Sequence, residues 1–288
     1  MLELFKKRNF SLFWFGEMIS VIGDQISLIA FPWLILQMTN SAALTGLVFA
    51  VQGIPRAVLM LAGGALVDRT SPRLMMIISN ALRLLLVFSL AYMISQDTAD
   101  ISIVFIMAFA FGVADAFFYP ASISILPSLV SRDELQTGNA IIQTTLHLGM
   151  TIGPFVAAFI IAGEIGSAAQ SAELVVSDSV LSAYDLDREG LARAFFIDGL
   201  TFALSLLSLL FVNVRKLNVE DETSSESSLF KEIRQASLWA WSIPAVRLGF
   251  IGMAVIHFFF MPMVFVGIPV WAKSHYTEGA YVYGVVKI

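Results

Sequence analysis

The chain has 288 residues, of which 58% are hydrophobic and only 14% are charged, with a net charge of −5 and no cysteine. Soluble domains carry about 25% charged residues, so this composition excludes an ordinary soluble protein and indicates a membrane protein. The lack of cysteine excludes disulfides and cysteine metal sites, and the net negative charge gives no support for nucleic-acid binding.

Seven apolar runs are long enough to cross a membrane as helices, because about 20 residues span the roughly 30 Å of hydrocarbon. An eighth run begins near Gly279, and the sequence ends at Ile288. We therefore predict an all-α fold, a polytopic membrane helix bundle. The seven runs lie near residues 10–36, 44–67, 73–94, 101–126, 139–162, 194–214 and 245–270.

Lysine and arginine concentrate on the side of the bundle that carries the N-terminus. Because positive charges gather in cytoplasmic loops, we predict a multi-pass protein of the cell (inner) membrane with a cytoplasmic N-terminus. The first run is too long for a secretory signal, so we interpret it as a retained helix. The basic residues on the N-terminal side are Lys6, Lys7, Arg8, Arg69, Arg73, Arg132, Arg215, Lys216, Lys231 and Arg234, against Arg188, Arg193 and Lys273 opposite.

A short hairpin, residues 63–73, joins the second and third runs and combines small and charged residues. Gly64 permits close helix approach, and Asp68 suits the positive end of a helix dipole. Arg69 and Arg73 mark the cytoplasmic side. This pattern predicts a clamp that controls conformational change at the inner face.

Ionisable residues at membrane depth need an explanation, since each costs about 2.5–3.5 kcal/mol on insertion scales. One interpretation pairs opposite charges inside the bundle, Arg56 or Arg83 with an acid. Another is proton coupling, in which an acid exposed to each side in turn loads and releases a proton, and Asp24 and Arg56 are the best placed for it. The candidates are Glu17, Asp24, Arg56, Arg83, Asp115 and Asp198. Of these, Glu17, Arg83 and Asp198 lie near enough to helix ends that we expect them to reach the interface by snorkelling.

The fifth run carries small residues every four positions, at Gly149, Gly153 and Ala157, with Pro154 beside them. Such a stripe lets another helix approach closely, and proline adds a bend. Packing alone explains a stripe of this kind as well as a functional motif does.

Two polar segments interrupt the apolar runs. Residues 163–193 form an outer insertion, for which the composition allows either a short surface element or disorder. Residues 215–244 begin as a linker and continue, from Leu229 to Trp241, with the helical spacing of an interfacial helix.

Several strings resemble those of the major facilitator superfamily of secondary transporters. Gly64-x-Leu66-x-Asp68-Arg69-x-x-x-Arg73 resembles its signature between helices 2 and 3, with Ser71 and Pro72 departing from the usual pattern. The string Gly149-x-x-x-Gly153-Pro154 resembles the helix 5 motif of its antiporters. The stretches from Tyr119 to Val130, Leu135 to Ala140 and Phe196 to Phe202 are similar to the branch of macrolide-efflux and enterobactin-exporter proteins.

This resemblance implies two six-helix halves that rock about a central cavity. Residues 1–214 would form the N-terminal half, 215–244 a cytoplasmic linker with an amphipathic helix, and 245–288 the start of the C-terminal half. It further implies a proton-coupled exporter of amphipathic or hydrophobic small molecules such as drugs or siderophores. The aromatic side chains expected to line the cavity are Phe31, Phe111, Phe118, Phe259 and Phe260.

No phosphate-binding loop, metal-ligand spacing or catalytic triad stands out in the sequence. We therefore expect no enzyme activity, no cofactor and no metal, and we expect the lipid bilayer, protons and a small-molecule substrate as partners. Two alternatives remain. One is a truncated or partner-dependent membrane protein that does not transport, or a half-transporter that works only as an oligomer. The other is an importer on the same fold.

Overall fold

The computed structural model describes residues 3–162, 179–214 and 229–275, and these ranges contain helices and turns and no strand. Its first six long helices each contain a stretch apolar enough to cross a membrane, which confirms the predicted all-α bundle. They are α1 (Arg8–Thr39), α2 (Ala42–Arg69), α3 (Pro72–Ser95), α4 (Ile101–Ser124), α5 (Leu135–Ala162) and α7 (Ser179–Phe211).

Local sequence signals begin these helices. The Ser41 hydroxyl accepts the backbone N–H of Leu44 at the start of α2 (3.3 Å), and the Asp100 carboxylate accepts that of Ser102 at the start of α4 (3.1 Å). Both side chains satisfy a backbone donor that the first helical turn leaves unpaired. Pro72 occupies the first turn of α3, where its missing N–H costs nothing.

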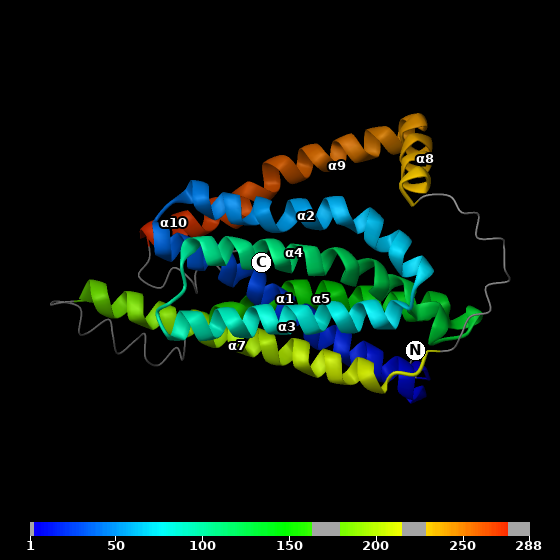
Figure 1. Ribbon diagram of the computed structural model, residues 1–288, viewed down its shortest axis with the longest axis horizontal. Coiled ribbons are helices and arrows are strands. Elements are labelled where there is room, and N and C mark those ends of the chain that lie inside the picture. Colours follow the sequence, from blue (N-terminus) through cyan, green and yellow to red (C-terminus); the bar gives the residue numbers. More distant parts are fainter. Residues whose placement is uncertain (1–2, 163–178, 215–228, 276–288) are drawn as a thin grey trace.

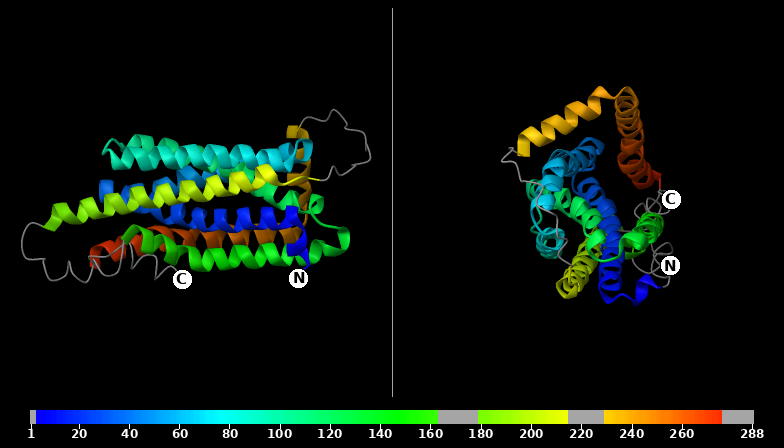
Figure 2. Two further views of the ribbon diagram at one scale, coloured as in Figure 1. Left: turned by 90° about the horizontal axis from the view of Figure 1, so that it is seen from below. Right: turned by 90° about the vertical axis from the view of Figure 1, so that its right-hand side faces the viewer.

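The helices are not packed in chain order. The first helix, α1, packs against α7 and α5, whereas α2 packs against α4, and α3 lies between α4 and α7. Figures 1 and 2 show the six helices side by side, and Figure 1 shows α4 between α2 and α3. The two helices of the 63–73 hairpin therefore run antiparallel without being main packing partners.

Two large apolar clusters form the bundle core. The cluster toward the N-terminal end includes Phe13 and Met76, and the larger one beyond it includes Ile26 and Val87. On both α1 and α3, polar and charged side chains occupy positions between the two clusters. The fold thus places a polar layer at the middle of an apolar bundle.

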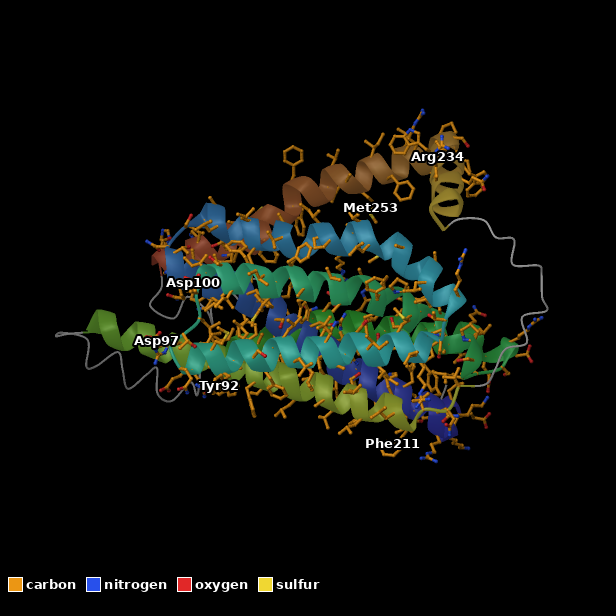
Figure 3. All side chains as sticks on the ribbon, in the orientation of Figure 1. Tyr92, Asp97, Asp100, Phe211, Arg234 and Met253 are labelled. Atoms are coloured by element: carbon orange, nitrogen blue, oxygen red, sulfur yellow. The ribbon has the colours of Figure 1, made fainter. Side chains whose placement is uncertain are left out.

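The sixth helix starts earlier than the sequence predicts. We expected its apolar run to begin near residue 194, but α7 begins at Ser179, so the later part of the 163–193 insertion is helical. Arg188 in this extension pairs with Asp97 in the α3–α4 turn (2.8 Å), at the end of the bundle where Figure 3 labels Asp97. The earlier part of the insertion, 163–178, lies outside the described residues.

After the bundle, the stretch predicted to be helical from Leu229 to Trp241 forms α8 (Leu229–Ser242), and its place at the membrane interface stays a prediction. The seventh predicted span, 245–270, consists of α9 (Pro244–Pro262), a π-helical turn (Met263–Gly267) and the start of α10 (Ile268–His275). The α9 helix runs along the outside of the bundle (Figure 2). At the α10 end, Lys273 Nζ donates to the carbonyl of Leu36 in α1 (2.9 Å). The eighth run, near Gly279, lies outside the described residues.

Candidate functional site

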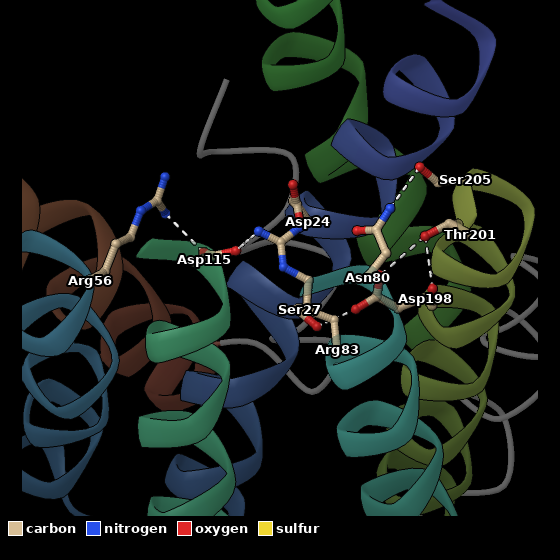
Figure 4. Close-up of polar contacts among 9 residues, drawn as sticks. All are labelled: Asp24, Ser27, Arg56, Asn80, Arg83, Asp115, Asp198, Thr201 and Ser205. Atoms are coloured by element: carbon tan, nitrogen blue, oxygen red, sulfur yellow. Dashed lines mark hydrogen bonds and ion pairs between the residues drawn. The ribbon is translucent and has the colours of Figure 1, made fainter. Parts of the chain in front are cut away.

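Four charged side chains from four helices form a continuous network of ion pairs inside the bundle. Arg83 in α3 donates through Nη2 to Asp115 Oδ1 in α4, and its Nη1 lies 3.5 Å from Asp24 Oδ1 in α1. Arg56 in α2 reaches the other oxygen of Asp115, with Nη1 to Oδ2 at 3.2 Å. Figure 4 shows these contacts. We call Asp24, Arg56, Arg83 and Asp115 the charge network.

The network runs from the interior to the surface of the described structure. The side chains of Arg83 and Asp115 are 2% and 8% exposed, whereas those of Asp24 and Arg56 are 32% and 45% exposed. Its two ends are therefore accessible to a proton or a ligand, while its centre is buried. Burial of the centre strengthens the electrostatic coupling between the ends, because the protein interior has a low dielectric constant.

Aromatic rings enclose the central guanidinium. The Cζ atom of Arg83 lies 4.3 Å from the ring centroid of Phe118, 5.6 Å from that of Phe111 and 5.4 Å from that of Phe202. These cation–π contacts stabilise the guanidinium at this position. Its Nε finds no hydrogen-bond partner among the described residues.

Three of the five phenylalanines expected to line a cavity lie near one another: Phe111 is in ring contact with Phe31 (5.9 Å between ring centroids), and Phe111 and Phe118 both contact the Arg83 guanidinium. Phe31, Phe111 and Phe118 are buried in the packed core, whereas Phe259 and Phe260 are exposed on α9. The prediction missed Phe202, the third ring around Arg83. Its sequence signal is its place one helical turn after Asp198, which puts both residues on the same side of α7.

The two remaining acids lie off the charge network. Glu17 and Asp198 are both buried, so the expectation that they and Arg83 reach the interface by snorkelling is wrong. All three occupy interior faces of their helices, and a buried side chain has no path to the membrane surface. The Ser27 hydroxyl donates to Asp198 Oδ2, and the Thr201 hydroxyl lies 3.3 Å from Oδ1. Glu17 Oε2 has no hydrogen-bond partner among the described residues.

The glycine that permits close approach in the 63–73 hairpin is Gly63, not Gly64. A methyl group built on Gly64 meets nothing within 4 Å, whereas one built on Gly63 would collide with the carbonyl group of Ala116 in α4. The correction follows from packing, because α2 packs on α4 and turns Gly63 toward it. A second glycine at this crossing, Gly112 in α4, faces the backbone of Gln52.

The arginines of the hairpin have different surroundings. Arg73 donates from Nε to the carbonyl of Leu209 (2.9 Å) and from Nη2 to that of Leu210 (2.8 Å). These carbonyls belong to the last turn of α7, so Arg73 caps that helix and ties it to α3. Arg69 is exposed at the end of α2, and the side chain of Asp68 lies outside the described residues.

The small-residue stripe of α5 faces α1. A side chain at Gly149 would collide with Val21, and one at Gly153 would collide with Gln25. Pro154 is buried beside them. The predicted close helix approach is therefore found, with α1 as the partner of α5.

The bundle gathers more acid than base around its polar layer. Among the described residues, the charge network supplies two carboxyl groups and two guanidinium groups, and Glu17 and Asp198 add two further carboxyl groups without an arginine in ion-pair contact. A buried carboxylate without a cation is costly, so such a group favours carrying a proton.

Comparison with known proteins adds a family and several relatives. The family model of the Major Facilitator Superfamily matches residues 13–286. The chain is 30% identical to the multidrug efflux pump Tap of Mycolicibacterium fortuitum, over 54% of this chain and 40% of the pump. It is 24% identical to Tap of Mycobacterium tuberculosis, over 91% of this chain and 58% of that pump.

A further relative is an uncharacterised MFS-type transporter of Bacillus subtilis, YvqJ, which is 25% identical over 49% of this chain and 34% of the transporter. The chain thus matches about a third to three fifths of the length of these curated relatives. No solved structure gives a significant match.

Proposed function

This chain belongs to the Major Facilitator Superfamily, and from that membership we propose that it is a secondary active transporter that exports drug-like molecules in exchange for protons. Two of the relatives are named multidrug efflux pumps, which favours export of amphipathic or hydrophobic compounds. The transporter works in the cytoplasmic membrane with its N-terminus inside.

The single observation that carries this proposal is the shared position of Arg83 between two acids. Its guanidinium contacts Asp24 and Asp115, which belong to different helices. A proton that binds Asp24 removes one attraction on Arg83 and leaves Asp115 as its carboxylate partner. Proton binding at the accessible end of the network thereby changes the forces between α1, α3 and α4.

Coupling follows if the same network responds to the substrate. Asp24 is partly exposed, so a substrate that approaches it competes with the proton for one carboxylate. Competition of this kind makes proton release and substrate binding mutually dependent, which is the requirement for exchange. Alternating access to the two sides of the membrane needs two global conformations of the transporter. The 63–73 hairpin, with Asp68, Arg69 and Arg73, is the proposed clamp that controls the change between these conformations.

The test is replacement of Asp24 by Asn, which keeps the shape of the side chain and removes its titration. We expect pH-driven export of a fluorescent drug such as ethidium, measured as efflux from cells or as uptake into inverted vesicles, to be abolished, while protein abundance stays unchanged. Asp97→Asn is the matched control, because Asp97 is an exposed acid in a turn. Export at the unmodified rate in the Asp24→Asn variant would contradict the role of Asp24.

A further inference from the structure

A row of buried polar side chains lines the interface between α7 and α1. Asp198, Thr201, Ser205 and Ser208 recur every three or four residues along α7, so they share one face of the helix. All four are buried, at 8% exposure or less. We call these four residues, together with Ser20, Ser27 and Asn80, the hydroxyl seam.

Small residues of α1 bring the two helices together along this row. A methyl group built on Gly16 would lie 3.1 Å from the Cβ atom of Ser208, and one on Gly23 would lie 3.0 Å from that of Thr201. Ser20 lies between these two glycines on the same face of α1. Because α1 and α7 run antiparallel, Ser20 lies at a level between Thr201 and Ser205.

Two oxygen atoms in this region lack a hydrogen-bond partner among the described residues although they are fully buried. They are Ser20 Oγ and Asn80 Oδ1, and both residues have 0% exposure. Asn80 is tied to the seam, since its Nδ2 donates to Ser205 Oγ (2.9 Å), as Figure 4 shows. Buried polar atoms in native proteins are nearly always paired, and a water molecule commonly supplies the missing partner.

The seam has a titratable group at the end that lies in the middle of the bundle. Asp198 is fully buried, and its carboxyl group accepts the hydroxyl of Ser27. The Thr201 hydroxyl donates to the backbone carbonyl of Asp198 (2.7 Å) and lies 3.3 Å from its Oδ1. The charged groups that act on it from neighbouring helices are Arg83 of α3 and Asp24 of α1, with none from α5 among the described residues. Neither arginine of the charge network forms an ion pair with it, so a proton is the simplest way to neutralise it.

The other end of the seam, at Ser208, lies near the N-terminal side of the bundle. The Ser208 hydroxyl donates to the carbonyl of Leu12. Just beyond the end of α7, the backbone N–H of Asn213 donates to Asn9 Oδ1 (3.1 Å), and Asn213 is exposed. The row of hydroxyls therefore runs from the middle of the bundle to Ser208, one turn before the end of α7.

We propose that the hydroxyl seam is a proton relay that connects Asp198 with the N-terminal side, where the exchanged proton is released, through water held between Ser20 and Asn80. Each hydroxyl or water accepts a proton from one neighbour and passes its own proton to the next. One O–H bond forms for each that breaks, so the hydroxyls end unchanged and Asp198 alone changes protonation. This relay rests on the proposed proton coupling, and it gives the transporter a proton route separate from the accessible end at Asp24.

The experiment follows deuterium exchange of the Asp198 carboxyl group by infrared spectroscopy of the purified chain in lipid, without any substrate. The carbonyl stretch of the protonated group is assigned by its loss in Asp198→Asn and by its frequency shift in Ser27→Ala, which removes a hydrogen bond and keeps the acid. We expect Ser20→Ala to slow the exchange at least tenfold. We expect Ser20→Thr, which keeps a hydroxyl, to restore it.

Thr45→Val is the matched control, because Thr45 is a fully buried hydroxyl in α2 that bonds the carbonyl of Ser41. The relay is overturned if no protonated carboxyl band depends on Asp198 or Ser27, or if Ser20→Ala exchanges as fast as Thr45→Val. Because the readout requires no transport, it separates failure of the relay from failure of the proposed function, which the export assay of Asp24→Asn measures.

Discussion

At the scale of single residues, Asp115 holds the charge network together. Its carboxylate lies between the guanidinium groups of Arg56 and Arg83, which would repel each other without an acid between them. Such an arrangement fixes positions more than it adds stability, because removing charges from water costs about as much as their attraction returns. Removing only the acid is different, since it leaves the buried Arg83 with Asp24 as its single ion-pair partner among the described residues, 3.5 Å away, and brings two guanidinium groups together without an acid between them.

We therefore predict that Asp115→Asn lowers the free energy of unfolding by about 3–5 kcal/mol. The matched variant Asp97→Asn breaks an exposed ion pair with Arg188, and we expect it to cost less than about 1 kcal/mol. Thermal unfolding of both purified variants in detergent measures the difference. Equal stability of the two would show that Asp115 does not balance the buried arginines.

The sequence predicts which residues enter this site better than how they meet. Intramembrane charge alone identifies Asp24, Arg56, Arg83 and Asp115, because each is costly in lipid. Their order of contact depends on the packing of α4 between α2 and α3, which no local pattern encodes. The burial of Asp198 differs from the prediction for the same reason, since burial depends on neighbouring helices.

At the scale of helices, the crossing of α2 and α4 depends on glycine at the contact. Gly63 and Gly64 are adjacent, yet a methyl group on Gly63 would lie 3.3 Å from the carbonyl carbon of Ala116 and closer still to its oxygen, and one on Gly64 meets nothing within 4 Å. A backbone carbonyl cannot rotate away as a side chain can. The two positions thus form a matched pair within one helix.

We predict that Gly63→Ala destabilises the protein by about 1–3 kcal/mol, because the two helices must separate. Gly64→Ala should be neutral or add up to about 1 kcal/mol, since alanine favours helix. Thermal unfolding compares the two variants under one condition. If Gly64→Ala proves the more harmful change, the hairpin glycine that matters is the one expected from the sequence motif.

The helix boundaries also show what a sequence can and cannot predict. The first six apolar runs give the helices, and Ser41 and Asp100 mark two of their starts. The polar composition of residues 179–193 hid the extension of α7, which has Arg188 paired with Asp97. A helix that projects beyond the membrane need not be apolar, so hydropathy does not detect it.

At the scale of the whole molecule, a polar layer lies inside an apolar bundle, and the bundle exposes large hydrophobic side chains such as Leu85, Ile106 and Leu207. This distribution is the reverse of a soluble protein and suits a lipid environment. Arg56 and Asp24 bring charge to the surface of the described structure. Charge at membrane depth faces protein or water, so we expect this face to border the transport pathway.

Orientation across the membrane is the remaining property of the whole molecule, and the lack of cysteine makes it measurable. Thr70 and Gln96 are exposed and lie at opposite ends of α3. In intact cells, a membrane-impermeant maleimide should label the Gln96→Cys variant and not the Thr70→Cys variant, because basic loops stay in the cytoplasm. After permeabilisation, both variants should react equally. Labelling of Thr70→Cys in intact cells would place the N-terminal side outside, and the proton relay would then open to the exterior.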